Sequence, residues 1–130
     1  MIVVDASVVL ESLLRTPAAK AVERRLFDSG ETLHAPHLID IEAAQVIRRY
    51  AANGEIDGGR GRAALADLAD LPLRRYPHDL LLPRIWELRN NLTAYDAAYV
   101  ALAEALDAPL ITRDQRLAAA SGHRARIELV

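Results

Sequence analysis

Short apolar runs alternate with helical segments along this chain, and this alternation restricts its fold more than any other feature. The segments between the runs carry apolar residues at helical spacing and end near Gly, Pro or Asn. Strands that alternate with helices in this way are typical of a parallel sheet with helices on both faces. The sequence therefore predicts an α/β fold in three layers, α/β/α, around a short central parallel sheet. The runs that we interpret as strands span residues 2–4, 32–35, 73–76, 110–112 and 127–130.

The predicted helices have recognisable start and stop signals. Pro17 and Pro36 each open a helix, and Asn53-Gly54 ends the longer of the two. Thr93 is placed to cap a later helix, whereas Asp57-Gly58-Gly59 reads as a turn between helices. The expected helices cover residues 6–14, 17–27, 36–52, 63–71, 80–88, 95–106 and 114–120.

Length and composition indicate one domain with a substantial core. With 130 residues, 52% of them hydrophobic and 26% charged, the chain can bury most of its apolar surface, so we expect a single domain over 1–130. The absence of cysteine excludes disulfides and a thiolate metal site. Because no apolar stretch is long enough to cross a membrane and no leader is visible, we expect a cytoplasmic location.

The charge balance gives no general signal for nucleic-acid binding. The formal net charge is -2 and the pI is about 6.1, whereas many nucleic-acid-binding domains are strongly basic. Any contact with nucleic acid must therefore depend on local groups of basic residues.

Four acidic residues lie where an apolar run meets the next segment. Asp5 and Asp114 follow two predicted strands, so both should emerge at the carboxyl edge of the sheet, where ligands bind. Glu42 and Asp96 lie near the starts of two amphipathic helices. A fold that sets these helices beside the strands places four carboxylates in one cleft. Such a cluster repels itself unless a cation is present.

Each acidic residue also has an ordinary interpretation. Asp5 and Asp114 can each cap the helix that follows. Glu42 alone can be a surface residue that interacts with the helix dipole. Asp96 opens an almost wholly apolar helix, where a carboxylate requires a partner. The four residues together favour a functional site.

Four blocks of the sequence carry a resemblance to a known family. They are Val4-Asp5-Ala6-Ser7, Glu42 in the third helix, Tyr95-Asp96-Ala97-Ala98-Tyr99-Val100-Ala101-Leu102-Ala103, and Leu110-Ile111-Thr112-Arg113-Asp114. In this order and spacing the chain resembles PIN-domain ribonucleases, specifically the VapC-type toxins of bacterial toxin-antitoxin pairs. The resemblance covers essentially all 130 residues, and the third block is the most specific.

The resemblance implies a PIN-like fold and a metal-dependent endoribonuclease in which the four acids form the catalytic quartet. Hard oxygen ligands of this kind suit Mg²⁺ or Mn²⁺. We expect Asp5 and Asp96 to bind the ion directly. Glu42 and Asp114 would bind through water or act as bases that orient water. Some members of the family have a further acid just after the last of the four, and this chain lacks it, so a second ion would be weakly held or would need an RNA phosphate.

Several residues near the quartet are candidates for supporting roles. Ser7 and Thr112 lie two residues from an acid of the quartet, within reach of a hydrogen bond to a carboxylate or to bound water. Arg113 is the basic residue that we favour at the substrate phosphate, with Arg15 and Arg116 as weaker candidates.

Three further residues are interpreted as structural. Asp40, two residues before Glu42 on the same helix, points about 200° away from it, since helical residues are about 100° apart, and supports the helix dipole. Trp86 and Tyr99 lie in apolar helical patterns and are read as packing residues of the core or of an interface.

The resemblance also implies partners: an RNA substrate, a second copy of the chain in a homodimer, and a cognate antitoxin whose tail occupies a groove. Val9, Leu13 and Leu14 in the first helix could line such a groove. Core packing explains these three residues equally well.

The main alternative function is a non-catalytic RNA-binding or regulatory module whose acidic pocket holds a structural cation. Two other classes fit less well. A receiver domain requires a late lysine, but Lys20 is the only lysine. A phosphatase with an aspartyl nucleophile requires a second aspartate at the position of Ser7. The sequence leaves open which RNA is cut, the number of ions, Mg²⁺ or Mn²⁺, and the class of antitoxin.

Overall fold

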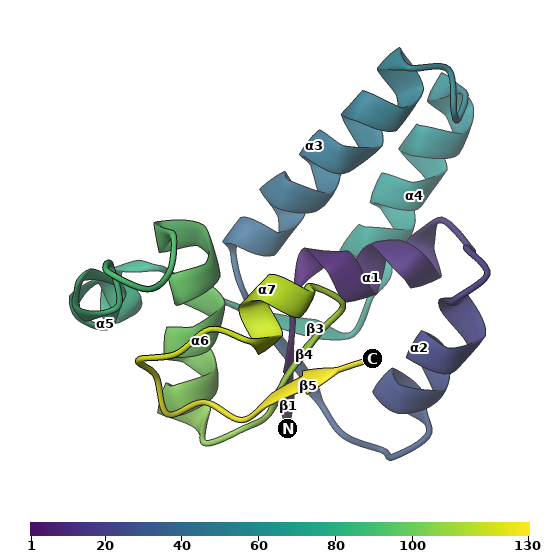
Figure 1. Cartoon of the computed structure of the whole chain (residues 1–130). Coiled ribbons are helices and arrows are strands. Elements are labelled where there is room, and N and C mark those ends of the chain that lie inside the picture. Colours follow the sequence, from purple (N-terminus) through teal and green to yellow (C-terminus); the bar gives the residue numbers. More distant parts are fainter.

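Five short strands form one parallel sheet at the centre of the protein (Figure 1). The computed structural model describes all residues 1–130. The spatial order is β3-β2-β1-β4-β5, and every neighbouring pair is parallel. The predicted parallel sheet is therefore confirmed. The strands are β1 (Ile2–Val4), β2 (Leu33–Pro36), β3 (Leu73–Tyr76), β4 (Leu110–Thr112) and β5 (Ile127–Leu129).

Helices cover both faces of this sheet. They are α1 (Ala6–Leu13), α2 (Ala19–Phe27), α3 (Leu38–Ala52), α4 (Gly58–Asp70), the 3₁₀ helix η1 (Asp79–Leu81), α5 (Leu82–Glu87), α6 (Ala94–Leu106) and α7 (Gln115–Ala118). Figure 1 shows α5 and α6 on one side of the sheet and α1 and α2 on the other, while α3 and α4 extend outward as a pair. The three-layer α/β/α arrangement is thus confirmed.

Two prolines lie outside the helices that they were expected to open. Pro36 is the last residue of β2, and α3 begins only at Leu38. The strand end tolerates a proline because the next residue supplies the N–H, with His37 donating to the Tyr76 carbonyl at 2.8 Å. The N–H of Leu38 donates to Nε2 of His78 at 2.9 Å, so this imidazole helps to cap α3. Helix α2 likewise begins after Pro17.

Helix α4 begins five residues earlier than the sequence predicts. Two consecutive glycines are poor helix formers, which made 57–59 read as a turn. In the structure Asp57 caps the helix, because its Oδ1 accepts a hydrogen bond from the N–H of Arg60 at 2.7 Å. Gly61 is buried, and a Cβ there would lie 3.2 Å from Cγ2 of Ile47. The close approach of α3 and α4 therefore favours glycine in this segment and overrides its low helix propensity.

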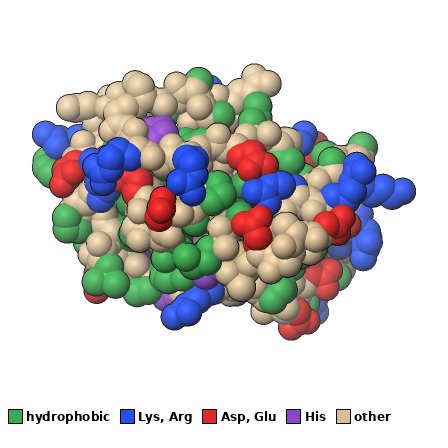
Figure 2. Space-filling model, turned by 90° about the horizontal axis from the view of Figure 1, so that it is seen from below, with side chains coloured by type: hydrophobic (Ala, Val, Ile, Leu, Met, Phe, Trp, Pro, Cys, Tyr) green, Lys and Arg blue, Asp and Glu red, His purple; other side chains and the backbone are tan.

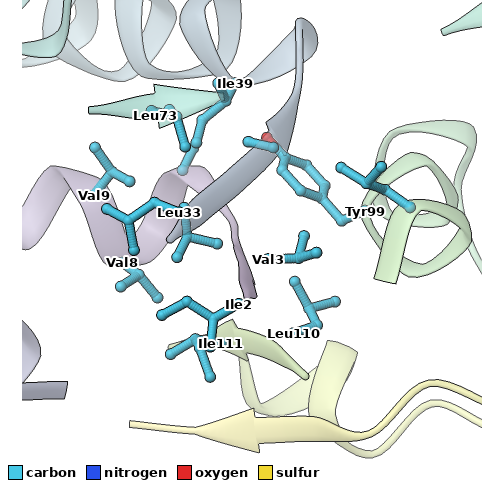
Figure 3. Close-up of a cluster of buried hydrophobic side chains, with 14 of the residues drawn as sticks. Ile2, Val3, Val8, Val9, Leu33, Ile39, Leu73, Tyr99, Leu110 and Ile111 are labelled. Carbon is cyan, nitrogen blue, oxygen red and sulfur yellow. The ribbon is translucent and has the colours of Figure 1, made fainter. Parts of the chain in front are cut away.

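The core surrounds the two central strands (Figure 3). Ile2, Val3 and Val4 of β1 are fully buried, as are Leu110 and Ile111 of β4. Strands with helices on both faces become continuous apolar runs, which explains why these segments contain no polar residue before their ends. Polar chemistry is thus confined to the residues that follow the strands.

The connection between β3 and β4 creates the crevice that matters for function. The chain leaves β1 toward β2 and β3 on one side, then crosses to β4 on the other side of β1. The helices after β1 and β4 therefore diverge beyond the carboxyl ends of these two neighbouring strands. In open α/β sheets this reversal of strand order is the place where ligands bind. Asp5 and Asp114 lie directly at it.

The surface shows no single dominant charge on the face seen in Figure 2, where acidic and basic side chains are interspersed. This agrees with the small net charge of -2. None of the helices combines the length and the apolar character that a membrane crossing requires.

Candidate active site

Asp5 is the buried centre of the site. It follows β1, caps α1 and is only 6% exposed. Its Oδ1 accepts hydrogen bonds from the Ser7 hydroxyl at 2.5 Å and from the Val8 N–H at 3.3 Å, and its Oδ2 accepts one from the Thr112 hydroxyl at 2.5 Å. Burial raises the pKa of Asp5, and the negative charge of Asp114 adds to the rise, while the hydrogen bonds oppose it. A buried carboxylate with an incompletely compensated charge can be stabilised by a cation.

Asp114 combines a structural contact with a position in the crevice. Its Oδ1 accepts hydrogen bonds from the N–H groups of Arg116 at 2.9 Å and Leu117 at 3.3 Å, so it caps α7. Its own N–H donates to the Thr112 hydroxyl oxygen at 3.0 Å. The Thr112 hydroxyl therefore joins the backbone of Asp114 to the carboxylate of Asp5. The capping role expected for Asp5 and Asp114 and their position in the crevice coexist.

Asp96 lies in the first turn of α6, where Thr93 caps the helix by accepting the Asp96 N–H at 3.2 Å. Burial raises the pKa of Asp96, and the charge of Asp114 raises it further, whereas a hydrogen bond from the Thr93 side chain and the cation of Arg116 oppose the rise. Thr93 is thus the one side chain that offers the Asp96 carboxylate a hydrogen bond.

Glu42 reaches the crevice from α3. Its Oε1 accepts a hydrogen bond from the Tyr99 hydroxyl at 2.5 Å. Burial raises the pKa of Glu42, as do the charges of Asp96 and Asp5, while the bond from Tyr99 opposes the rise. Asp40, two residues earlier, instead pairs with Arg75, whose Nε lies 2.8 Å from its Oδ2. This confirms that Asp40 points away from the site.

The four acids are close enough to act on one another electrostatically. Asp114 raises the pKa of Asp5 and of Asp96, and Asp5 and Asp96 raise that of Glu42, in each case after the larger effect of burial. They do not form a compact cage, since no three acidic or histidine groups in the structure are arranged to hold a metal ion. Their oxygen-only donor set and accumulated negative charge nevertheless fit a hard divalent cation with retained water.

Both residues expected to support the quartet contact it. Ser7 and Thr112 each donate a hydrogen bond to Asp5. The Ser7 hydroxyl oxygen also accepts the N–H of Arg113 at 3.0 Å. The loop after β4 is therefore attached to the start of α1 through the hydroxyl of Ser7.

The guanidinium of Arg113 is held by two contacts outside the quartet. Its Nε lies 3.3 Å from Oε1 of Glu11, and one terminal nitrogen donates to the Val130 carbonyl at 2.8 Å. Arg116 is exposed and makes no ion pair, and its charge acts on Asp96. Arg116, a weaker candidate in the sequence, is therefore the arginine whose charge acts on a carboxylate of the quartet.

An open groove of about 600 Å³ lies between α1 and α3 beside the quartet, with Glu42 in its wall. Ile41 and Tyr95 in this groove are 70% and 63% exposed. Val9 and Leu13, by contrast, are 1% and 5% exposed. Of the two interpretations of these residues, core packing is therefore correct.

Tyr99 is the contact that the sequence did not reveal. It is buried, as its apolar helical pattern indicates, but its hydroxyl reaches Glu42. A signal was present, since Tyr99 follows Asp96 by three residues and so lies on the same helix face. Trp86, assigned from the sequence to the core or to an interface, is 67% exposed, so it is not a core residue, and the guanidinium carbon of Arg89 lies 4.4 Å from its ring centroid.

Comparisons with known proteins agree with this architecture. The model of the PIN domain family matches residues 2–122. Two solved structures share the fold: Mycobacterium tuberculosis VapC20, described as a sarcin-ricin loop cleaving toxin, and VapBC2 from Rickettsia felis, bound to a DNA fragment from its promoter. VapC20 matches with a TM-score of 0.71 and 16% identity over 92% of this chain and 94% of that chain. The VapBC2 chain matches with a TM-score of 0.70 and 13% identity over 99% and 98%.

Sequence similarity is closer to Ribonuclease VapC12 of Mycobacterium tuberculosis. The two are 47% identical over 130 residues, which are 100% of this chain and 99% of that relative. A match of this length leaves no part of the fold or of the quartet outside the compared region. The chain therefore belongs to the PIN domain family and, within it, to the VapC-type ribonuclease toxins.

Proposed function

We propose that the carboxylates of Asp5, Glu42, Asp96 and Asp114 hold Mg²⁺ or Mn²⁺ and that the protein uses this site to hydrolyse phosphodiester bonds in RNA. One observation carries the proposal: a buried aspartate at the reversal of strand order shares its crevice with three further acids. Without a cation, this negative charge is compensated only in part, by hydrogen bonds and by the charge of Arg116.

The hydrogen bonds suggest how the four acids divide their roles. Asp96 is a direct ligand, because Thr93 is the only side chain that offers its carboxylate a hydrogen bond and further oxygen lone pairs are left for a cation. Asp5 keeps a lone pair on Oδ2 beyond its bond from Thr112 and is the second direct ligand. Glu42 and Asp114 each have one oxygen occupied, so each presents its other oxygen to the crevice, where it can orient water and accept a proton from it.

A bound divalent cation would stabilise the charge on the phosphoryl oxygens and make water easier to deprotonate. The protein itself orients the acids through the hydroxyls of Ser7, Thr112 and Tyr99. Arg116, exposed beside Asp96, is better placed than Arg113 to contact a substrate phosphate, because Arg113 would first have to leave Glu11 and the Val130 carbonyl.

We propose two protein partners. The groove between α1 and α3 would receive a segment of a cognate antitoxin, with its apolar side chains against Ile41 and a cation near Glu42. A second copy of the chain would cover the apolar side chains of η1 and α5, where Leu80, Leu82 and Trp86 are 79%, 56% and 67% exposed. An RNA substrate places this activity in the cytoplasm.

The test is to map new 5′ ends in total bacterial RNA after incubation with purified protein and Mg²⁺ or Mn²⁺. Asp96→Asn removes one carboxylate of the quartet, and Asp67→Asn makes the same chemical change at an exposed position of α4. Discrete ends with the wild type and Asp67→Asn, and none with folded Asp96→Asn, are expected.

Equal cleavage by Asp96→Asn would exclude the proposed site. Cleavage by none of the three proteins, combined with retention of RNA on the wild type, would favour a non-catalytic RNA-binding module in which the cation is structural. The same experiment identifies the RNA that is cut.

A further inference from the structure

The Tyr99 hydroxyl is the only group of the protein that donates a hydrogen bond to the carboxylate of Glu42. Tyr99 lies on α6 and is 2% exposed, and Figure 3 shows its hydroxyl oxygen pointing away from the α6 ribbon among buried apolar side chains. The hydroxyl donates to Oε1 of Glu42 at 2.5 Å and makes no other hydrogen bond. A buried phenol without this acceptor would be left unsatisfied, so the contact is required by both partners.

The direction of this hydrogen bond is fixed. A phenol is protonated at neutral pH, and an ionised carboxylate can only accept, so the Tyr99 hydroxyl is the donor. Glu42 must accept through Oε1, and its Oε2 accepts no hydrogen bond from the protein. Since no buried polar atom lacks a partner, Oε2 is open to solvent.

The same bond joins two elements that carry acids of the quartet. Tyr99 follows Asp96 by three residues on α6, and Glu42 belongs to α3. Both helices pack against β2. A glutamate side chain has three rotatable bonds. Without this hydrogen bond it would gain conformational entropy by rotating toward solvent. The phenol thus restricts Glu42 to the orientation that faces Asp96 and Asp5.

We propose that Tyr99 is a positioning residue that occupies Oε1 of Glu42 and leaves Oε2 as the single oxygen with which Glu42 serves the cation site. This inference rests on the proposed function, because it assumes that the quartet binds a divalent cation. Tyr99 itself contacts neither the cation nor the RNA. Its effect on both passes through Glu42.

The experiment compares Mn²⁺ binding by calorimetry in the wild type, Tyr99→Phe and Tyr76→Phe. The control removes the same hydroxyl from a tyrosine of β3, where the hydroxyl lies 2.6 Å from Nδ1 of His34 and contacts no acid of the quartet. Loss of an outer hydrogen bond to a ligand weakens metal binding about 10-fold or more. We expect that increase in Kd for Tyr99→Phe and less than a twofold change, on the order of assay error, for Tyr76→Phe.

A double-mutant cycle separates positioning from a general structural effect. If Tyr99 acts through Glu42, Tyr99→Phe in a Glu42→Gln background causes no further loss of Mn²⁺ affinity. A merely structural role would lower the affinity in both backgrounds. Thermal unfolding without metal shows that each variant is folded.

Three results are decisive. Wild-type affinity in folded Tyr99→Phe would overturn the positioning role and leave the proposed function intact. An equal loss in both backgrounds would assign Tyr99 to the packing of the core. Absence of Mn²⁺ and Mg²⁺ binding by the wild type, together with absence of RNA cleavage, would overturn the proposed function and this inference with it.

Discussion

The hydroxyl of Thr112, the last residue of β4, donates a hydrogen bond at 2.5 Å to Oδ2 of Asp5, the residue that follows β1. The two residues are 107 positions apart in the sequence. Thr112 is fully buried, and its oxygen also accepts the N–H of Asp114 at 3.0 Å. One hydroxyl thus sets the positions of two acids at the reversal of strand order. Its removal should affect both stability and metal binding.

Thr112→Val keeps the shape of the side chain and removes the hydroxyl. We expect the free energy of unfolding to fall by about 1–3 kcal/mol, because Asp5 loses a buried donor and the N–H of Asp114 loses its acceptor. Urea unfolding of the wild type, Thr112→Val and Thr112→Ser measures this. Thr112→Ser keeps the hydroxyl and should lose less. A valine variant as stable as the wild type would show that water replaces the hydroxyl.

Asp96→Asn should change stability in opposite directions with and without metal. Burial and the charge of Asp114 disfavour the ionised Asp96, so the neutral amide should stabilise the metal-free protein. At 100-fold excess over Kd, Mn²⁺ stabilises the wild type by about 2.7 kcal/mol.

The variant should gain much less from Mn²⁺, because it lacks one ligand of the site. Melting temperatures with Mn²⁺ and with EDTA measure both effects. Asp67→Asn is the matched control and should behave as the wild type. Equal responses of Asp96→Asn and the wild type to Mn²⁺ would contradict the role of Asp96 as a ligand.

Glu104 should make stability depend on pH on the acidic side. Its side chain is 6% exposed, its Oε2 lies 2.7 Å from Nε of Arg84, and its Oε1 accepts the N–H of Arg124 at 2.8 Å. Burial alone would raise the pKa of Glu104, but these hydrogen bonds and charges outweigh burial and lower it below its ordinary value of 4.5. The stabilisation is therefore complete above pH 4.5 and is lost as the pH falls through the lowered pKa.

The variant for this measurement is Glu104→Gln. It should be less stable than the wild type by about 2 kcal/mol at neutral pH, the range for hydrogen bonds to charged groups. The difference should shrink well below pH 4.5, where the wild-type carboxyl is protonated. Glu87→Gln, at an exposed partner of Arg84, should change stability by at most about 0.5 kcal/mol. If the difference in the free energy of unfolding between Glu104→Gln and the wild type does not change with pH, the effect is due to packing.

Trp86→Ala should weaken self-association. A tryptophan that is 67% exposed beside exposed leucines is the type of residue that dominates an interface, and its truncation costs about 2 kcal/mol or more, roughly 30-fold in Kd. Sedimentation as a function of concentration measures this. Phe27→Ala changes an exposed aromatic residue on α2 and should leave the dimer unchanged. A dimer unaffected by Trp86→Ala would place the second copy on another face.

The sheet and two of the acids could be predicted because they depend on local sequence. β1 and β4 end where the apolar runs end, and Asp5 and Asp114 lie one and two residues beyond these strands. The carboxyl ends of parallel strands lie at one edge of the sheet, so such residues meet there regardless of the conformation of the loops. Glu42 and Asp96 required the resemblance, since nothing local shows that α3 and α6 approach the same edge.

The errors arose where distant contacts decide local structure. The sequence read 57–59 as a turn, whereas Asp57 caps α4 and Gly61 lies close to Ile47 of α3. The guanidinium of Arg113 contacts Glu11 and the carbonyl of Val130, two partners that the sequence does not identify. The bond from Tyr99 to Glu42 links residues that are 57 positions apart. The spacing from Asp96 to Tyr99 shows that the two share a helix face, but it does not identify Glu42 as the partner.

The crossing of the chain from β3 to β4 has a consequence during synthesis. The first acid of the site is at residue 5 and the last at residue 114, and β4, which binds β1 directly, is made near the end. A nascent chain that stops before Thr112 has neither the hydroxyl that holds Asp5 nor Asp114. The four acids of the quartet are therefore present together only when almost the whole chain has been made.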